Sequence, residues 1–581
     1  MKLPIPGIYV QEQEYTLNPL RIDTRTLAAF VGICERGPLD TPVLIKNFDG
    51  YLKLFGGFET PGMLPYSIYS FFKCGGSECI VVRVADKTEA VSAILDIPTG
   101  GTSIKLTASS TGKWGNYIHA RIWHETENPV LLLSADYEKG LWIEADSDVI
   151  DAGDAVRISV LGRELYRTVI RKDNRKLYLS KPVGLFKRLH ENTAKIVMER
   201  VYFSMMLAYK DEQESFLRLS VNPASERYYK TYINNRSRLC SVYGDEKLQH
   251  DIPLPAFSLY ATGGNDGIAD MNPSDFIGFY NGPNEYAGLG SLESFDDISL
   301  IAVPDAWWLL RLSGKPQEQK EKAVLAVQEA MVRQAQRFAG RYAVLDAPDA
   351  ESGTDVRRWA QHFDSSFAAA YYPFIDMLDP CDAAGIHTIR IPPSAAVCGC
   401  IVATDGEKGV FYPPANQTIA GAVGVSHRPD ESEQELLGDS RVNVLRYFPG
   451  KGIKIWGART LSSDAAWRYI NVRRTFSRIS QSIQRGTRWA VFETNDKKLR
   501  KRIVRQVSGF LLDLWMKGYL SGSTPEQGFY VRCDEELNPV ENIDKGIIAF
   551  EVGLAIVKPV EFFIVHITAE KDGASVYIKE T

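Results

Sequence analysis

The 581-residue sequence lacks a long uninterrupted apolar run. It begins MKLPIPGIYV, with two prolines and a glycine in the first seven residues, where a secretory signal needs about 7–15 consecutive apolar residues. The most apolar long segment, 547–567, is interrupted by Glu551, Lys558, Pro559 and Glu561, and is therefore a poor membrane span. We expect no membrane insertion and no conventional secretion of a monomer.

Cysteine and histidine are few and do not cluster. Of the eight cysteines, Cys74 and Cys79 lie five residues apart and Cys398 and Cys400 lie two apart, and the eight histidines are not beside them. No cysteine pair has the two-residue gap of a zinc knuckle. We therefore expect reduced, mostly buried thiols, no bound metal and no cofactor.

An excess of charge of one sign is also missing. The formal net charge is -5, which gives no global electrostatic reason to expect nucleic acid or an anionic membrane as a partner. The composition, 45% hydrophobic and 24% charged, is that of a globular protein. The length predicts about three or four domains.

Motifs for catalysis or nucleotide binding are incomplete. The segment 263–267 (GGNDG) lacks the Lys-Ser/Thr of a phosphate loop, and Lys451, between two glycines, lacks the upstream glycine and the following hydroxyl. The segment 424–428 (GVSHR) lacks the final glycine of a nucleophile elbow. We expect no enzyme. An α/β enzyme with an unrecognised ligand site is the alternative, and a static tube or shell protein is a second one.

What the sequence does contain is a regular α/β pattern from residue 299 onward. Segments 300–303 and 341–345 are predicted strands, 316–339 is an amphipathic helix, and 356–367 is a second helix. This alternation implies a mainly parallel sheet flanked by helices. Further helices are predicted from Ser463 to Gly486 and from Asp496 to Gly518.

The remaining predicted elements are strands. Residues 86–261 have short β-rich runs separated by Gly, Asp and Asn turns, which suggests a β-rich domain inserted into another domain. The predicted strands are 27–33, 80–84, 155–160, 165–170, 176–179, 529–532, 547–557 and 561–568.

Positive charge is concentrated near the start of the last long helix and on the helix before it. Cations at a helix N-terminus oppose the helix dipole, so an acidic partner surface would explain them, whereas an ordinary solvated face is the alternative. The residues concerned are Lys497, Lys498, Arg500, Lys501, Arg502 and Arg505, followed by Arg473 and Arg474.

The two ends of the chain read as extended strands. Residues 6–15 have too few apolar side chains to bury both faces, whereas the C-terminal segment is apolar on both faces. The C-terminal strand either lies inside its own domain or pairs with strands of other subunits. The candidate residues of these arms are Gly7, Ile8, Tyr9, Val10, Gln11, Glu12, Glu561, Phe562, Phe563, Ile564, Val565, His566 and Ile567.

Blocks spread along most of the chain resemble the tail sheath proteins of contractile phages, R-type pyocins and extracellular contractile injection systems. The section 131–253 matches least, as expected of a variable outer domain. The blocks are LAAFVGICERGPLDTPV (27–43), FFKCGGSECIVVRVA (71–85), TGKWGNYI (111–118), LIAVPDA (300–306), VNVLRYFPGKGIKIWGARTL (442–461), WRYINVRRTF (467–476), FLLDLWMKGYLSG (510–522) and AIVKPVEFFIVHI (555–567).

The resemblance implies an α/β fold, α+β overall, with several domains and two terminal arms. The expected divisions are an N-terminal linker arm, 1–22; the first part of the sheath core, 23–95; a β-rich inserted outer domain, 96–260; an α/β sheath domain, 261–440; a C-terminal inner domain facing the tube, 441–558; and a C-terminal linker arm, 559–581.

The resemblance also implies a mechanical function. Sheath subunits stack as sixfold rings around an inner tube, and their arms complete small sheets in neighbouring subunits. Contraction from a metastable extended state drives the tube through a target envelope. The implied partners are further copies of this chain, the inner tube protein, baseplate and terminal cap proteins, and paralogous sheath subunits. Assembly is expected in the bacterial cytoplasm, and the basic residues above are the candidate tube contact.

Overall fold

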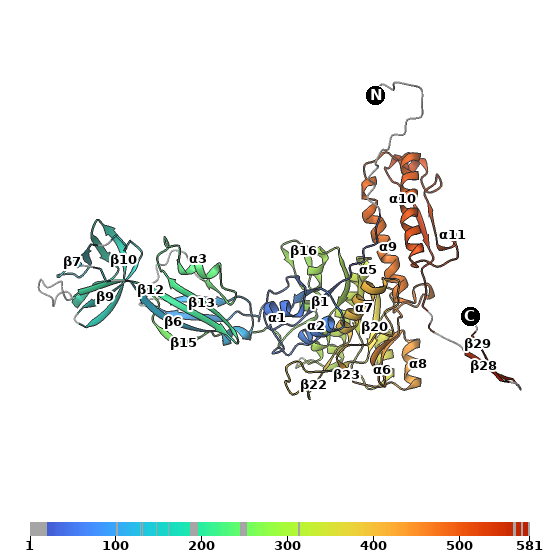
Figure 1. The fold of residues 1–581 in the computed structure, drawn as a ribbon, viewed down its shortest axis with the longest axis horizontal. Coiled ribbons are helices and arrows are strands. Elements are labelled where there is room, and N and C mark those ends of the chain that lie inside the picture. Colours follow the sequence, from blue (N-terminus) through green and yellow to red (C-terminus); the bar gives the residue numbers. More distant parts are fainter. Residues whose placement is uncertain are drawn as a thin grey trace, which may run out of the picture.

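The computed structural model describes residues 20–578 except 100–102, 128, 131, 147, 161, 186–195, 244–251, 312–313, 560, 562–564 and 571–572. Figure 1 shows a central body of helices and strands, a long β-rich extension from one side of it, and a helical column that rises from it. The mixed α/β fold class is therefore confirmed. The predicted arm residues 7–12 and 562–564 lie outside the described residues.

The central body is built on an eight-stranded sheet. Its strands run in the order β2-β3-β1-β18-β19-β20-β24-β25, with six parallel inner strands and an antiparallel strand at each edge. A mainly parallel sheet, as predicted, is therefore confirmed. The strands are β1 (Leu27–Gly32), β2 (Val43–Ile45), β3 (Cys79–Arg83), β18 (Ile298–Ala302), β19 (Tyr342–Asp346), β20 (Ala368–Tyr372), β24 (Val442–Phe448) and β25 (Gly452–Trp456).

Helices cover both faces of this sheet, so its inner strands are largely buried and mostly apolar. Successive residues of β19 pack into opposite layers: Ala343 and Leu345 share a cluster with side chains of α5, and Val344 shares one with side chains of α7. One layer holds α5 (Gln317–Arg337), α6 (Gly353–Ala360) and α8 (Glu431–Asp439); the other holds α1 (Phe48–Phe55), α2 (Leu64–Lys73) and α7 (Ser394–Lys408).

The β extension comprises residues 94–260 and has two apolar clusters of its own. A nine-stranded sheet has the order β15-β6-β12-β9-β10-β11-β8-β7, with β13 also paired to β12, and a three-stranded sheet has the order β14-β5-β4. The elements are β4 (Ile94–Pro98), β5 (Ser103–Ala108), η1 (Lys113–Tyr117), β6 (His119–Thr126), β7 (Leu132–Ala135), β8 (Trp142–Ala145), β9 (Ala155–Val160), β10 (Arg163–Asp173), β11 (Lys176–Leu179), β12 (Ile196–Tyr209), β13 (Glu212–Leu219), α3 (Tyr229–Asn234), β14 (Cys240–Tyr243) and β15 (Ala256–Tyr260).

The helical column and several short elements complete the chain. The column holds α9 (Ile470–Gly486), η7 (Arg488–Ala490), α10 (Lys497–Met516), α11 (Pro525–Gly528), β26 (Phe529–Arg532), α12 (Val540–Asp544) and β27 (Glu551–Leu554). The others are α4 (Pro273–Ile277), β16 (Tyr280–Gly282), β17 (Glu285–Tyr286), η4 (Gly288–Ser294), η5 (Pro304–Arg311), β21 (Ile375–Leu378), β22 (Thr388–Ile391), β23 (Ala422–Val425), η6 (Ala465–Trp467), β28 (Val565–Glu570) and β29 (Gly573–Ile578).

Two predicted helices are longer than the observed ones. The helix predicted for 356–367 ends at Ala360, because residues 361–367 form a loop in which Asp364 accepts hydrogen bonds from Ser463 N (2.9 Å) and Oγ (2.5 Å). The helix predicted from Ser463 begins only at Ile470, because Asp464 caps just the short η6 turn. Ile470 N donates to Ala458 O (2.9 Å), and Arg459 and Tyr469 form an antiparallel bridge, so the intervening chain is closed into a loop.

The predicted strand 547–557 is also too long, since only Glu551–Leu554 forms a strand, paired with β26. The thiols agree with expectation: six of the eight cysteines are buried, while Cys381 is exposed and Cys533 is half-buried. The divisions of the chain into domains given above stay predictions.

Candidate functional site

The helical column is formed by α9 and α10, which lie side by side (Figure 1). Both helices are amphipathic, and their apolar faces meet in one buried cluster that includes Ile479 and Ile483 of α9 and Ile503, Val507 and Leu511 of α10. Residues spaced by three and four along each helix supply this seam. The opposite face of α10 carries exposed charged side chains, among them Lys498 and Lys501.

The predicted basic cluster lies on the first turns of α10. Asp496 is the N-cap, and its carboxylate accepts a hydrogen bond from Leu499 N (2.7 Å). This capping carboxylate offsets part of the unfavourable interaction between the helix dipole and the cations that follow. Lys498, Lys501 and Arg505 are exposed, and their spacing of three and four residues places them on one face.

The other three members of the cluster have partners within the chain. Lys497 pairs with Glu535 (2.9 Å), although both side chains are exposed, so this pair contributes little. The Arg502 guanidinium carbon lies 4.0 Å from the ring centre of Trp489. Arg500 is buried. Its charge is therefore not presented at the surface of the chain, whereas the sequence had predicted Arg500 to be part of the candidate tube contact.

Arg473 and Arg474 are buried as well, so they are not exposed cations. The Arg473 guanidinium lies against Phe367, Trp467 and Phe476, and burial lowers the pKa of Arg473 to about 10. Arg474 forms an ion pair with Asp405, with its Nη1 atom 3.0 Å from Oδ1. These two arginines hold α9 on the central body, a role that their spacing in the sequence did not reveal.

Two further arginines of α9 bind the chain where it enters the body. Arg478 Nη2 donates to Arg25 O (2.5 Å) and Ser299 Oγ (2.6 Å), and Arg485 pairs with Asp297 (2.7 Å). The segment just after the predicted N-terminal arm is therefore fixed to α9 and to β18. Periodicity alone gave no signal for these contacts, because their partners are 179 to 453 residues away in the sequence.

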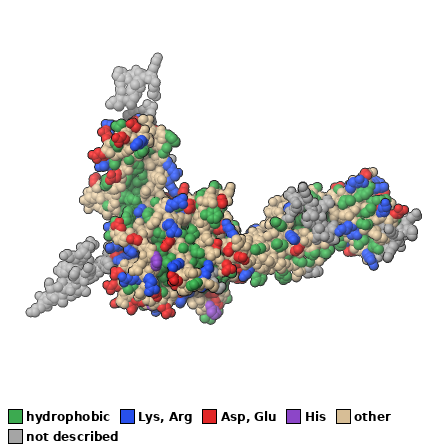
Figure 2. Space-filling view, turned by 180° about the vertical axis from the view of Figure 1, so that it is seen from behind, with side chains coloured by type: hydrophobic (Ala, Val, Ile, Leu, Met, Phe, Trp, Pro, Cys, Tyr) green, Lys and Arg blue, Asp and Glu red, His purple; other side chains and the backbone are tan. Residues whose placement is uncertain are grey.

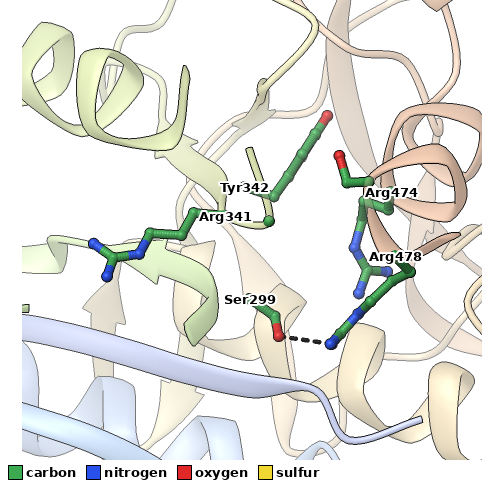
Figure 3. A pocket seen from close by; sticks show the side chains of 7 residues that line it. Ser299, Arg341, Tyr342, Arg474 and Arg478 are labelled. Atoms are coloured by element: carbon green, nitrogen blue, oxygen red, sulfur yellow. Dashed lines mark hydrogen bonds between the residues drawn. The ribbon is translucent and has the colours of Figure 1, made fainter. Parts of the chain in front are cut away.

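A small cavity lies beside Arg478, between α9 and the sheet (Figure 3). Ser299, Tyr342, Arg474 and Arg478 are among the residues that line it. Arg341 also lines it, with its side chain pointing away from the two α9 arginines (Figure 3). Its volume is about 10 Å³, enough for about one water molecule. A substrate of ordinary size does not fit this cavity.

The described part of the C-terminal segment contains two small sheets. β26 and β27 pair with each other, and in the described residues neither has another strand at its second edge. Of the predicted arm residues, Glu561 accepts hydrogen bonds from Arg459 Nε and Nη2, both 2.8 Å. Val565, His566 and Ile567 belong to β28, which pairs with β29.

Other kinds of site are not apparent in the described residues. They contain no group of three or more His, Cys, Asp or Glu side chains that could hold a metal ion. None of the helices described is long and apolar enough to cross a membrane. Acidic and basic side chains are interspersed over the visible face of the central body (Figure 2).

Comparison with models of protein families shows which known domains this part of the chain resembles. Residues 316–461 match the phage tail sheath protein central domain, and residues 462–570 match the phage tail sheath C-terminal domain. The first match covers the α5–β25 part of the central body and the second covers the helical column. Two consecutive sheath domains therefore define the class of this chain.

Individual relatives agree with the family match. A prophage major tail sheath protein of Pseudomonas aeruginosa is 27% identical over 259 residues, 43% of this chain and 62% of the relative. The tail sheath protein of Escherichia phage P2 is 23% identical over 296 residues, 50% of this chain and 68% of the relative. The matching segment thus spans less than two thirds of the Pseudomonas relative.

Solved structures share the fold. The helical sheath of the anti-feeding prophage in its contracted state has a TM-score of 0.51 at 17% identity, covering 98% of this chain and 100% of the other. A sheath tail protein of Listeria innocua has a TM-score of 0.53 at 12% identity, covering 93% and 96%. The resemblance to the contractile tail sheath family that the sequence motifs indicated is thus confirmed.

Proposed function

We propose that this chain is the structural subunit of a contractile sheath. It polymerises as stacked sixfold rings around an inner tube and contracts from a metastable extended state. The observation that carries the proposal is the pair of consecutive sheath domains, residues 316–570, on a chain with the sheath fold. Baseplate, terminal cap and paralogous sheath proteins are the further partners. Assembly takes place in the bacterial cytoplasm, before the tail or particle is released.

The sheet formed by β26 and β27 supports a linked assembly. Its open edges expose backbone N–H and C=O groups to which strands from other subunits can add. The N-terminal arm, residues 7–12, and the C-terminal arm, residues 561–567, are the strands proposed to do so. Arg478 binds Arg25 O and Arg485 pairs with Asp23 (3.4 Å), so both fix the root of the N-terminal arm and a pull on the arm reaches the central body.

Contraction then needs no nucleotide, since the energy comes from better contacts in the contracted form. About 40 Å² of extra apolar burial per subunit corresponds to ~1 kcal/mol, multiplied over many subunits. The contact with the tube must be weak enough to release. Lys498, Lys501 and Arg505 suit such a contact, because exposed charge pairs contribute only ~0–1 kcal/mol each.

Electron microscopy of the purified chain tests the proposal, with a variant that lacks Met1–Glu14. The full chain should form wide helical cylinders, in long and short forms when tube and baseplate are supplied. The truncated chain should keep its thermal unfolding curve and lose polymerisation, because the central sheet and the helical column are built from residues 27 onward. Dispersed full-length particles under every condition would favour the alternative, an α/β enzyme with an unrecognised ligand site.

A further inference from the structure

The loop between α9 and α10 exposes a large aromatic side chain completely. Phe492 has a relative exposure of 105%, and its neighbour Val491 is 60% exposed. An exposed phenylalanine is unfavourable in water, since burying such a side chain gains ~1.5–3 kcal/mol. Two backbone hydrogen bonds form this loop: Val491 N donates to Arg488 O and Glu493 N donates to Ala490 O, both 3.2 Å.

Phe492 also has a strained backbone. Its φ is +70°, Val491 has φ −66° and ψ 131°, and Glu493 N donates to Ala490 O (3.2 Å). These values match a type II turn with Phe492 at the position that normally requires glycine or asparagine. The left-handed conformation costs an L-residue about 1–2 kcal/mol. The other non-glycine residues with positive φ in the described chain are Asp, Asn, Lys or Arg.

Folding therefore gains nothing from phenylalanine at this position, where glycine would relieve the strain and remove the apolar exposure. Side chains kept in strained, exposed positions are concentrated at functional sites. An aromatic residue is also the side chain that most often dominates binding energy at protein interfaces. The turn thus has the properties of a contact point for a partner.

The surroundings of the turn indicate the chemistry of that partner. Trp489, three residues before Phe492, donates from Nε1 to Gln506 Oε1 (2.8 Å), and its ring lies 4.0 Å from the Arg502 guanidinium carbon. The turn is therefore held against the basic face of α10. From Glu493 to Arg505 the sequence has six Lys or Arg and two acidic residues, a net charge of +4.

We propose that Phe492 is an apolar anchor that inserts into a socket bordered by carboxylates on a partner protein, while Lys498, Lys501 and Arg505 contact those carboxylates. This inference rests on the proposed function, in which that partner is the inner tube. The charge contacts alone are weak and tolerate sliding along the tube. A single inserted aromatic ring fixes one register of each subunit on the tube and is withdrawn on contraction.

The test compares Phe492→Asn with Ile386→Asn, because Ile386 is a 75% exposed apolar residue in the β21–β22 loop of the central body. Bare inner tubes released from contracted native particles serve as the probe in cosedimentation. Phe492→Asn should bind about 30-fold more weakly, the loss typical of an aromatic anchor. Its thermal unfolding midpoint should stay equal or rise, and Ile386→Asn should bind normally.

The possible failures are distinguishable. If Phe492→Asn binds tubes like the unaltered chain while Lys498→Glu/Lys501→Glu does not, the anchor is refuted and the proposed function stands. If Phe492→Asn prevents polymerisation of the chain without tubes, the ring contacts a neighbouring sheath subunit and the inference is wrong. If the unaltered chain neither polymerises nor binds tubes, both the inference and the proposed function are wrong.

Discussion

At the scale of single residues, Asp346 shows how the fold changes a side chain's chemistry. It ends β19 and is buried beneath α7, where Oδ1 accepts a hydrogen bond from Ser394 N (2.7 Å). Burial raises the pKa of Asp346 to about 7, from an ordinary value of 3.8. One hydrogen bond from α7 does not compensate for the lost hydration of the carboxylate.

This buried carboxyl predicts a pH-dependent stability. Between pH 4 and 7 the folded chain holds a proton on Asp346 that the unfolded chain has released, so this stabilising contribution is lost as pH rises through about 7. Asp346→Asn keeps an acceptor for Ser394 N and removes the titration. Relative to the variant, the unaltered chain should lose on the order of 2–4 kcal/mol across this range.

Urea unfolding of both proteins at several pH values from 4 to 8 measures this difference. All other titrating groups are the same in the two proteins, so their contributions cancel in the difference between the two free energies of unfolding. The difference between the two free energies of unfolding should change steadily up to about pH 7 and then level off. Parallel pH curves would show that Asp346 titrates normally in the folded chain.

At the scale of elements, the sequence predicted strands and helices well where the pattern of apolar residues within the segment itself determines the element. The short runs 155–160 and 176–179 are β9 and β11 to the residue, and the amphipathic pattern of 316–339 corresponds to α5. The predicted ends of helices were wrong where contacts with residues distant in the sequence determine where the helix begins or ends. Ile470 begins α9 because its backbone bond to Ala458 O and an antiparallel bridge between Arg459 and Tyr469 close the preceding residues into a loop.

Contacts with residues distant in the sequence also determined which residues of the candidate site are exposed. The arginines at 473, 474 and 500 look like their exposed neighbours in the sequence. They are buried because Phe367, Asp405 and Asn495 pack against them or bind them. Lys498 and Lys501 are exposed members of the cluster, and their role as a tube contact stays a prediction. Phe492 went unnoticed, since its strain is visible only in the backbone.

Another element whose role depends on distant contacts is the β12–β13 turn, which joins the β extension to the central body. Lys210 Nζ lies 2.7 Å from Glu35 Oε1 and 3.1 Å from Glu59 Oε2, and Arg36 pairs with Glu212. Glu35 and Arg36 follow β1, so the turn is clamped to the central sheet. These ion pairs, in addition to the two chain connections, therefore fix the orientation of the extension relative to the central body.

Replacing both cations of this clamp, Arg36→Ala/Lys210→Ala, should free the extension to swing without unfolding it. Removal leaves Glu35 buried without its main cation, which adds a local loss of stability. Spin labels on the extension and on the central body should give a wider distance distribution in the variant, and the solution radius of gyration should change. Circular dichroism should remain the same.

A matched control removes two salt bridges inside the extension. In Lys172→Ala/Arg175→Ala the lost partners are Asp151 and Asp146, both within residues 94–260. This variant should retain the distance distribution of the unaltered chain. If the clamp variant also retains it, the two chain connections alone determine the direction of the extension.

At the scale of the whole molecule, the β extension and the central body have separate cores. The two apolar clusters of the extension draw on residues 93–261 alone, whereas those of the central body contain no buried residue between Val84 and Met271. Each part therefore buries its own apolar surface. The predicted insertion, 96–260, stays a prediction.

The connections between the β extension and the central body suggest how to remove the extension from the chain. The outgoing and returning chains run side by side: Ile94 N donates to Thr262 O (2.8 Å), Thr262 N donates to Ile94 O (3.0 Å), and Val91 and Asn265 form a second pair of hydrogen bonds. Ile94 and Thr262 are therefore placed as the two ends of a hairpin. A two-residue Asn-Gly turn can join such a pair.

Replacing residues 95–261 by Asn-Gly should leave a chain that folds and polymerises. The central sheet, the helical column and the proposed arms are all retained, and the main loss is the set of contacts that Glu35 and Arg36 make with the β12–β13 turn. Thermal unfolding should show the central body melting within a few degrees of its midpoint in the full chain, and electron microscopy should show thinner cylinders with the same helical repeat. Aggregation of the shortened chain would mean that the extension is required for folding. A folded chain that fails to polymerise would instead place a sheath contact on the extension.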